Sequence, residues 1–179
     1  MKQLTFVRHG ETGSNAARVF NFKTEPLNET GKKQALRLAQ KLSVESFDLI
    51  LCSPLARTRS TLEPILEGRQ VPVEYWNELV EFNFGNLEGE AYLEVENLFS
   101  GLARNLYREN TQDLKLRAEA FWNLISDRHE QNILIVSHGA IMCLLFAVYY
   151  KVAPENYENF RINDWEFMDN CDVKKLIIE

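Results

Sequence analysis

Three short apolar runs and two further segments indicate the strands of a sheet. Residues 49–52 and 133–136 are continuously apolar, residues 4–7 are apolar apart from Thr5, and each run ends abruptly in polar residues, which is typical of strands buried on both faces of a parallel sheet. A helix-like segment follows each of them, at once or after a loop, and this alternation predicts βαβ units. Residues 160–163 and 173–178 are further strand candidates, the second as a candidate edge strand.

Helical spacing follows the first and the third of these runs. Apolar residues recur between positions 35 and 42, behind a turn rich in helix-start residues at 28–31, which predicts a crossover helix. Residues 139–150 are the longest apolar stretch. We interpret them as a buried helix, because a helix that crosses a bilayer needs about 20 apolar residues.

Residues 90–130 carry two amphipathic patterns, one at 95–106 and the other at 114–125. Each pattern predicts a helix, and the polar stretch 109–113 between them predicts a loop. A helical insertion of this kind often covers a site, and we expect it to do so here.

Length, charge and cysteine content narrow the classes of function. With 179 residues, of which 45% are hydrophobic, the chain fits one folded domain over 1–179. Its formal net charge of −6 would repel nucleic acid and anionic membranes, so neither is an expected partner. Three cysteines, and a start without a signal-peptide pattern, favour a reduced, cytoplasmic setting.

The candidate chemistry lies in the polar residues that follow the three strands. His9 follows the first strand, Ser53 and Arg57 follow the second, and His138 follows the third. Because ligands of an open parallel sheet bind outside the carboxyl ends of its strands, we expect these side chains to meet at one edge. His129 precedes its strand and is expected at the opposite edge.

This edge would form a positive cluster in an acidic protein. Arg8 and Arg57 suit a phosphoryl group, because the planar guanidinium donates paired hydrogen bonds to neighbouring oxygens. Gly10 and Gly139 let backbone N–H groups approach an anion, and Gly139 also opens the helix that follows. The expected ligand is a phosphate ester, which we interpret as a small phosphorylated metabolite.

A histidine at this edge can react as well as bind. A neutral imidazole nitrogen is a competent nucleophile, and neighbouring arginines favour the neutral ring of His9. The leaving oxygen then needs a proton, for which Glu81 is the best candidate. Paired histidines also suggest a metal site, but no third histidine, paired carboxylate or Cys-x-x-Cys joins them. We expect neither metal nor cofactor.

Several segments around these residues resemble the histidine phosphatase superfamily, the phosphoglycerate mutase-like enzymes. The resemblance rests on Val-Arg-His-Gly-Glu-Thr at 7–12 with Asn15 beyond it, Pro-Leu-Asn-Glu-Thr-Gly at 26–31, Cys-Ser-Pro-Leu-Ala-Arg-Thr at 52–58, Leu-Val-Glu-Phe-Asn-Phe-Gly at 79–85, and Val-Ser-His-Gly at 136–139. These blocks follow the family's order and touch most of the chain.

The resemblance implies a fold and a set of roles. The family fold is α/β, a three-layer arrangement of a mainly parallel sheet flanked by helices. It implies that His9 is phosphorylated during turnover and that Glu81 is the acid and base. The phosphoryl group would be held by Arg8, Arg57 and His138, with Asn15 as a further contact. No metal is implied.

The chain departs from the family pattern in two places. Residues 19–22 keep no glycine where many relatives have one, and 110–113 stand in place of a Gly-Glu-Ser stretch. Both departures concern the rim that sets specificity. Arg104, Arg108 and Arg117 are nearby, and we expect all three on a solvated helix face.

The leading hypothesis is a phosphatase that hydrolyses a small phosphomonoester through a phosphohistidine. Mutase-type phosphoryl transfer is an alternative, but it needs an intermediate protected from water and usually a larger closing region. The other alternative is a catalytically silent member of the family that binds a phosphorylated ligand or a partner protein. The presence of every residue expected to do chemistry argues against it.

Overall fold

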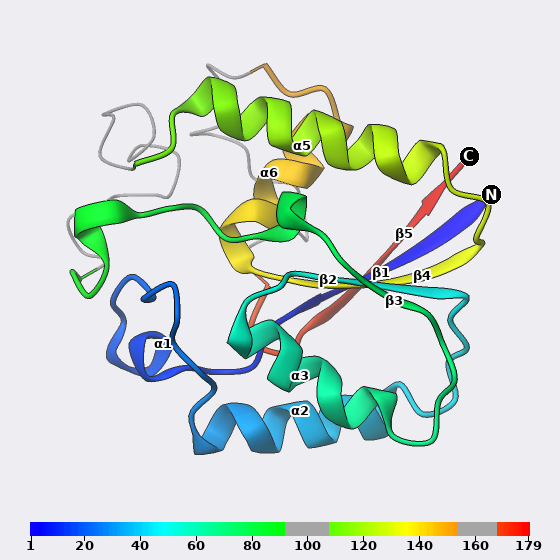
Figure 1. The fold of residues 1–179 in the computed structure, drawn as a ribbon, viewed down its shortest axis with the longest axis horizontal. Coiled ribbons are helices and arrows are strands. Elements are labelled where there is room, and N and C mark those ends of the chain that lie inside the picture. The colour runs from blue at the N-terminus through cyan, green and yellow to red at the C-terminus, as the bar shows by residue number, and fades with distance from the viewer. Residues whose placement is uncertain (92–107, 154–167) are drawn as a thin grey trace.

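The apolar runs form the centre of a five-stranded sheet in the computed structural model, which describes residues 1–91, 108–153 and 168–179 (Figure 1). The strands are β1 (Lys2–Arg8), β2 (Leu49–Cys52), β3 (Val73–Tyr75), β4 (Asn132–Ser137) and β5 (Val173–Ile178). Their spatial order is β3-β2-β4-β1-β5. The first four run parallel, and β5 pairs antiparallel with β1 at the edge. The predicted strands at 4–7, 49–52, 133–136 and 173–178 are thus confirmed.

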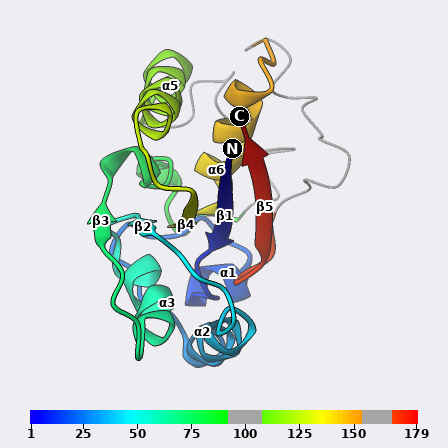
Figure 2. The ribbon, with the colours of Figure 1, turned by 90° about the vertical axis from the view of Figure 1, so that its right-hand side faces the viewer.

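Helices cover both faces of this sheet and complete the three predicted layers (Figure 2). One face carries α2 (Glu29–Lys41) and α3 (Ala56–Leu66), and the other carries α5 (Thr111–Ser126) and α6 (Gly139–Tyr149). The short helix α1 (Gly13–Ala17) and the 3-10 turns η1 (Asn77–Leu79) and η2 (Gly85–Leu87) lie in the connections. None of the helices in the described part of the chain combines the length and apolarity needed to cross a bilayer.

The continuous apolar strands supply both halves of the core. Successive side chains of a strand point to opposite faces, so Phe6 packs with α5 and α6 whereas Val7 packs with α2 and α3. Ile135 and Val136 divide in the same way on β4. The lack of polar alternation in these runs therefore reflects the burial of both faces of the strands.

Three other predicted elements are not confirmed by the structure. The strand at 160–163 and the helix at 95–106 lie outside the described residues. The loop at 109–113 is partly wrong, because α5 begins at Thr111. Asn110 is its N-cap and accepts a hydrogen bond from the Asp113 amide, so these polar residues start a helix. The short edge strand β3 had no apolar run to reveal it.

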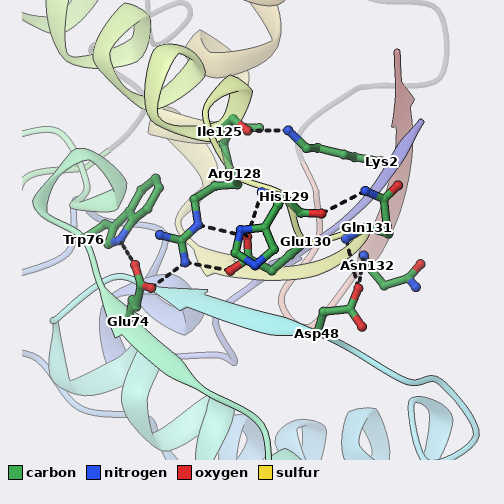
Figure 3. Close-up of polar contacts among 10 residues, drawn as sticks. All are labelled: Lys2, Asp48, Glu74, Trp76, Ile125, Arg128, His129, Glu130, Gln131 and Asn132. Atoms are coloured by element: carbon green, nitrogen blue, oxygen red, sulfur yellow. Dashed lines mark hydrogen bonds and ion pairs between the residues drawn. The ribbon is translucent and has the colours of Figure 1, made fainter.

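The amino-terminal edge of the sheet is held by polar contacts (Figure 3). Asp48 accepts hydrogen bonds from the amides of Gln131 and Asn132, at 2.9 and 2.8 Å, where β4 begins. Arg128 forms ion pairs with residues of β3 and of the turn before β4. His129 is almost fully exposed in this turn, before the first residue of β4, as predicted.

Candidate active site

The carboxyl ends of β1, β2 and β4 bring the predicted strand-end residues together. The His9 amide donates to the carbonyl of Ser137 at 3.0 Å, and the Ser53 amide donates to the carbonyl of Val136 at 2.9 Å. The rings of His9 and His138 lie edge to face, with their centroids 5.1 Å apart. The convergence expected from parallel strands is therefore present.

His9 is held as a neutral ring with one defined reactive nitrogen. Its side chain is buried, and Nδ1 lies 2.7 Å from the Gly10 carbonyl oxygen. A carbonyl only accepts hydrogen bonds, so Nδ1 carries the proton and Nε2 keeps its lone pair. Burial, and then the charges of Arg57 and Arg8, lower the pKa of His9 well below its ordinary value. Nε2 is therefore available as a nucleophile.

Arg57 connects the second strand end to His138. Its guanidinium is buried, its Nε donates to His138 Nδ1 at 3.1 Å, and its Nη1 donates to the carbonyls of Phe22 and Lys23. Because Nδ1 accepts, the neutral His138 ring carries its proton on Nε2, which donates to Ser53 Oγ at 2.8 Å. Burial and Arg57 also lower the pKa of His138 well below its ordinary value.

The loop after β1 is set by a close approach of two backbones. A Cβ on Gly10 would lie 2.6 Å from the Gly31 carbonyl oxygen at the start of α2, so only glycine fits. The Gly10 amide donates to Thr61 Oγ1 at 2.9 Å, and this hydroxyl donates to the Arg57 carbonyl. The loop that carries His9 is thereby tied to the helix that carries Arg57.

Arg8 and Asn15 lie in a network with the segment before β5. Arg8 Nη1 donates to the carbonyl of Met168 at 2.7 Å. Asn170 Nδ2 donates both to the His9 carbonyl and to Asn15 Oδ1, at 2.9 and 3.1 Å. Asn15 Nδ2 in turn donates to Asn21 Oδ1 at 2.8 Å. The carbonyl oxygen and one N–H of the Asn15 side chain are thus bonded to protein, and its contact with phosphate stays a prediction.

Glu81 lies at the amino end of α6. Its carboxylate accepts hydrogen bonds from the amides of Ala140 and Ile141, at 3.2 and 3.0 Å, and from its neighbour Phe82. These hydrogen bonds satisfy backbone amides that have no partner within the helix. The amides that follow Gly139 are therefore occupied by Glu81, and a phosphate contact at Gly139 also stays a prediction.

A cavity of about 430 Å³ opens beside Arg57 and Glu81. Charged residues of both signs line it together with amides, among them Asn21, Lys23, Arg57, Glu81, Glu109 and Arg117. His9 and His138 are buried and are not among the residues that line this cavity, whereas Arg57, which bonds to His138, is. A polar molecule of small size would therefore meet Arg57 and Glu81 first.

The prediction that three arginines lie on a solvated helix face is wrong for Arg117. Arg104 lies outside the described residues. Arg108 is exposed as expected, but it lies in a bend before α5 and not on a helix. The side chain of Arg117 is only 16% exposed and pairs with Glu109 at 3.1 Å. Its place next to Leu114 and Ala118, at the border of the apolar helix face, was the available signal.

Sequence reasoning also missed several residues that support the site. Thr61 lies one helical turn after Arg57, so helical spacing could have revealed it. Glu109 gave no signal, because its partner Asn83 is 26 residues away. Asn21 bonds to Asn15 and Thr12, which are near in the sequence, but these contacts lie in an irregular segment whose spacing follows no helical or strand period. In the described part of the chain, no group of three or more histidine, cysteine, aspartate or glutamate side chains is placed to hold a metal ion.

Comparisons with known proteins agree with this architecture. Residues 4–179 match the family described as "Histidine phosphatase superfamily (branch 1)". The chain is 33% identical to an adenosylcobalamin/alpha-ribazole phosphatase of Escherichia coli (strain K12), over 93% of this chain and 89% of that protein. It is 31% identical to phosphoserine phosphatase 1 of Hydrogenobacter thermophilus, over 89% and 82%. A crystal structure of the alpha-ribazole phosphatase of Shigella flexneri superposes with a TM-score of 0.74 at 33% identity, over 91% and 87%.

Proposed function

Because the chain belongs to the histidine phosphatase superfamily, branch 1, we propose that it hydrolyses a small phosphomonoester with His9 as the nucleophile. Phosphohydrolases of this superfamily pass the phosphoryl group through a phosphohistidine. The observation that carries the residue assignment is the fixed, neutral ring of His9, whose Nε2 keeps a lone pair beside Arg57.

The proposed reaction has two steps. Nε2 of His9 forms a bond to phosphorus while the ester oxygen leaves, and Glu81 gives that oxygen a proton. A water then attacks phosphorus, Glu81 takes its proton, and the bond to Nε2 breaks to release inorganic phosphate. Positioning and charge neutralisation are the main demands of such a transfer.

The phosphoryl oxygens are proposed to be held by hydrogen-bond donors around His9. The contacts would come from Arg8, Arg57 and His138, with Asn15 and Gly139 as further contacts. Arginine keeps its charge and donates paired hydrogen bonds, which suits the oxygens at this strand edge. To take part, His138 Nε2–H would give up its hydrogen bond to Ser53 Oγ and donate to a phosphoryl oxygen instead.

The cavity supports a small and polar substrate. The relatives' names give phosphoserine and an alpha-ribazole phosphate as substrates of those proteins. The cavity of about 430 Å³ beside Arg57 has amides and charges of both signs in its lining. We therefore propose a small phosphomonoester with polar groups that match these amides and charges, such as a phosphorylated amino or hydroxy acid.

The nucleophile can be tested with an aryl phosphate. The wild-type protein should release phosphate at the same rate with and without a metal chelator, and a rapid quench should trap an acid-labile, alkali-stable adduct. His9→Ala should abolish the adduct, whereas His129→Ala changes a histidine far from the site and should keep it. An adduct that persists in His9→Ala would refute the assignment.

The acid can be tested by the leaving group. An aryl oxide needs less protonation than an alkoxide, so Glu81→Gln should slow alkyl phosphates more than aryl phosphates. A panel of phosphorylated metabolites, ranked by kcat/KM, then tests the substrate class. Equal slowing of both ester classes would remove Glu81 from the mechanism.

A further inference from the structure

The segment that carries Glu81 has little regular structure of its own. It runs between η1 and η2, and no strand pairs with it among the described residues. The carboxylate is bound to the amino end of α6, but the backbone on either side needs separate support. A proton donor must be held in a narrow range of positions to be effective.

One ion pair provides this support on both sides of Glu81. Arg117 on α5 donates through Nη1 to the Val80 carbonyl, one residue before Glu81. Its Nη2 donates to Glu109 Oε2 at 3.1 Å, and this same oxygen accepts the amide of Asn83 at 2.7 Å, two residues after Glu81. Glu109 and Arg117 thus hold the segment through backbone hydrogen bonds at residues 80 and 83.

The charges are also arranged in a way that packing alone does not require. The other inward residues of α5 near this point are apolar, namely Leu114 and Ala118. Burying an ion pair is costly unless its hydrogen bonds are well satisfied, and apolar residues often serve stability better. Arg117 lies close enough for its charge to act on both Glu81 and His138. Glu109 offsets that charge next to the proposed acid.

We propose that Arg117 and Glu109 form a positioning clamp for Glu81, so that α5 sets the place of the proton donor. The inference rests on the function proposed above. Arg117 and Glu109 act through Glu81 and not on the phosphoryl group. Both line the cavity, so a polar substrate in it also lies beside the residues that place the acid.

The test compares leaving groups, because a loss of packing would slow all esters alike. In Arg117→Met, kcat/KM for an alkyl phosphate should fall about ten- to a hundredfold, as expected for a misplaced acid. For an aryl phosphate the loss should be less than about threefold. The inhibition constant for inorganic phosphate should not change, since it reports binding at the phosphoryl site.

A double-mutant cycle isolates the coupling to Glu81. In the Glu81→Gln background, Arg117→Met should add no further leaving-group effect, because the group it positions is gone. Lys115→Met is the matched control, since Lys115 lies on the same helix in a more exposed pair with Glu119, and it should behave as wild type. Glu109→Gln removes the charge but keeps an acceptor for the Asn83 amide, and it should give a smaller loss in the same direction.

Three outcomes would overturn the proposal. They are equal slowing of alkyl and aryl esters, a weaker binding of inorganic phosphate in Arg117→Met, and an undiminished effect in the Glu81→Gln background. If Arg117→Met does not fold, Arg117→Lys and Glu109→Gln carry the same comparison. Failure of the function itself is recognised separately, because Glu81→Gln in the otherwise wild-type protein would then not distinguish the two ester classes.

Discussion

Acidification should destabilise this protein through His9 and His138. Both rings are buried, and burial followed by nearby arginine charge lowers each pKa well below 6.5. In the unfolded chain the pKa returns to about 6.5, so the unfolded state binds more protons as the pH falls. The stability from these rings is complete above the unfolded pKa and is lost as the pH falls below it.

The size of this loss of stability follows from the linkage between protonation and unfolding. Between about pH 7.5 and about pH 5.5, protonation of one histidine in the unfolded state alone removes about 1.4 kcal/mol from the free energy of unfolding. The two histidines together should remove about 2.8 kcal/mol if they titrate independently. Carboxylates add their own pH dependence, so the histidine part must come from a comparison of variants.

Urea unfolding of wild type and His9→Gln at both pH values provides this comparison. The difference in free energy of unfolding between the two proteins should move by about 1.4 kcal/mol in favour of the variant on acidification. His138→Gln should show a similar movement. His129→Gln should show none, because that ring is almost fully exposed and lies away from the buried pair of histidines. A pH-independent difference for His9→Gln would refute the inferred neutral, buried ring.

Other predictions concern the support of the site. Gly10→Ala should destabilise the fold strongly and abolish phosphatase activity, because its Cβ would lie 2.6 Å from a backbone oxygen; thermal unfolding and aryl phosphate turnover measure this. Thr61→Val keeps the volume but leaves the buried Gly10 amide without its acceptor, so urea unfolding should show a loss of about 1–3 kcal/mol. Burial raises the pKa of the Cys52 thiol to about 12, so peptide mapping should find it unmodified by iodoacetamide in the native protein and alkylated in urea; native alkylation at neutral pH would contradict this.

The sequence by itself determined every strand of the described sheet except β3, together with the layers and the identity of the strand-end residues. Continuous apolar runs such as 133–136 record burial on both faces of a sheet, and this is a local property of the chain. Parallel pairing then places His9 and His138 at one edge by topology alone. That reasoning needed no side-chain detail, and the register of β1 against β4 bears it out.

Only the tertiary structure decided which atoms of these residues are free to react. The tautomers of His9 and His138 depend on the Gly10 carbonyl and on Arg57, and the latter pairing spans 81 residues of sequence. Arg117 looked like a solvated residue, because its place at the border of an apolar helix face hints at burial but does not reveal its partners. Its role beside Glu81 arises from the packing of α5 against a segment 37 residues away. Hydrogen bonds between distant segments form only once the elements are docked, so periodicity along the chain does not record them.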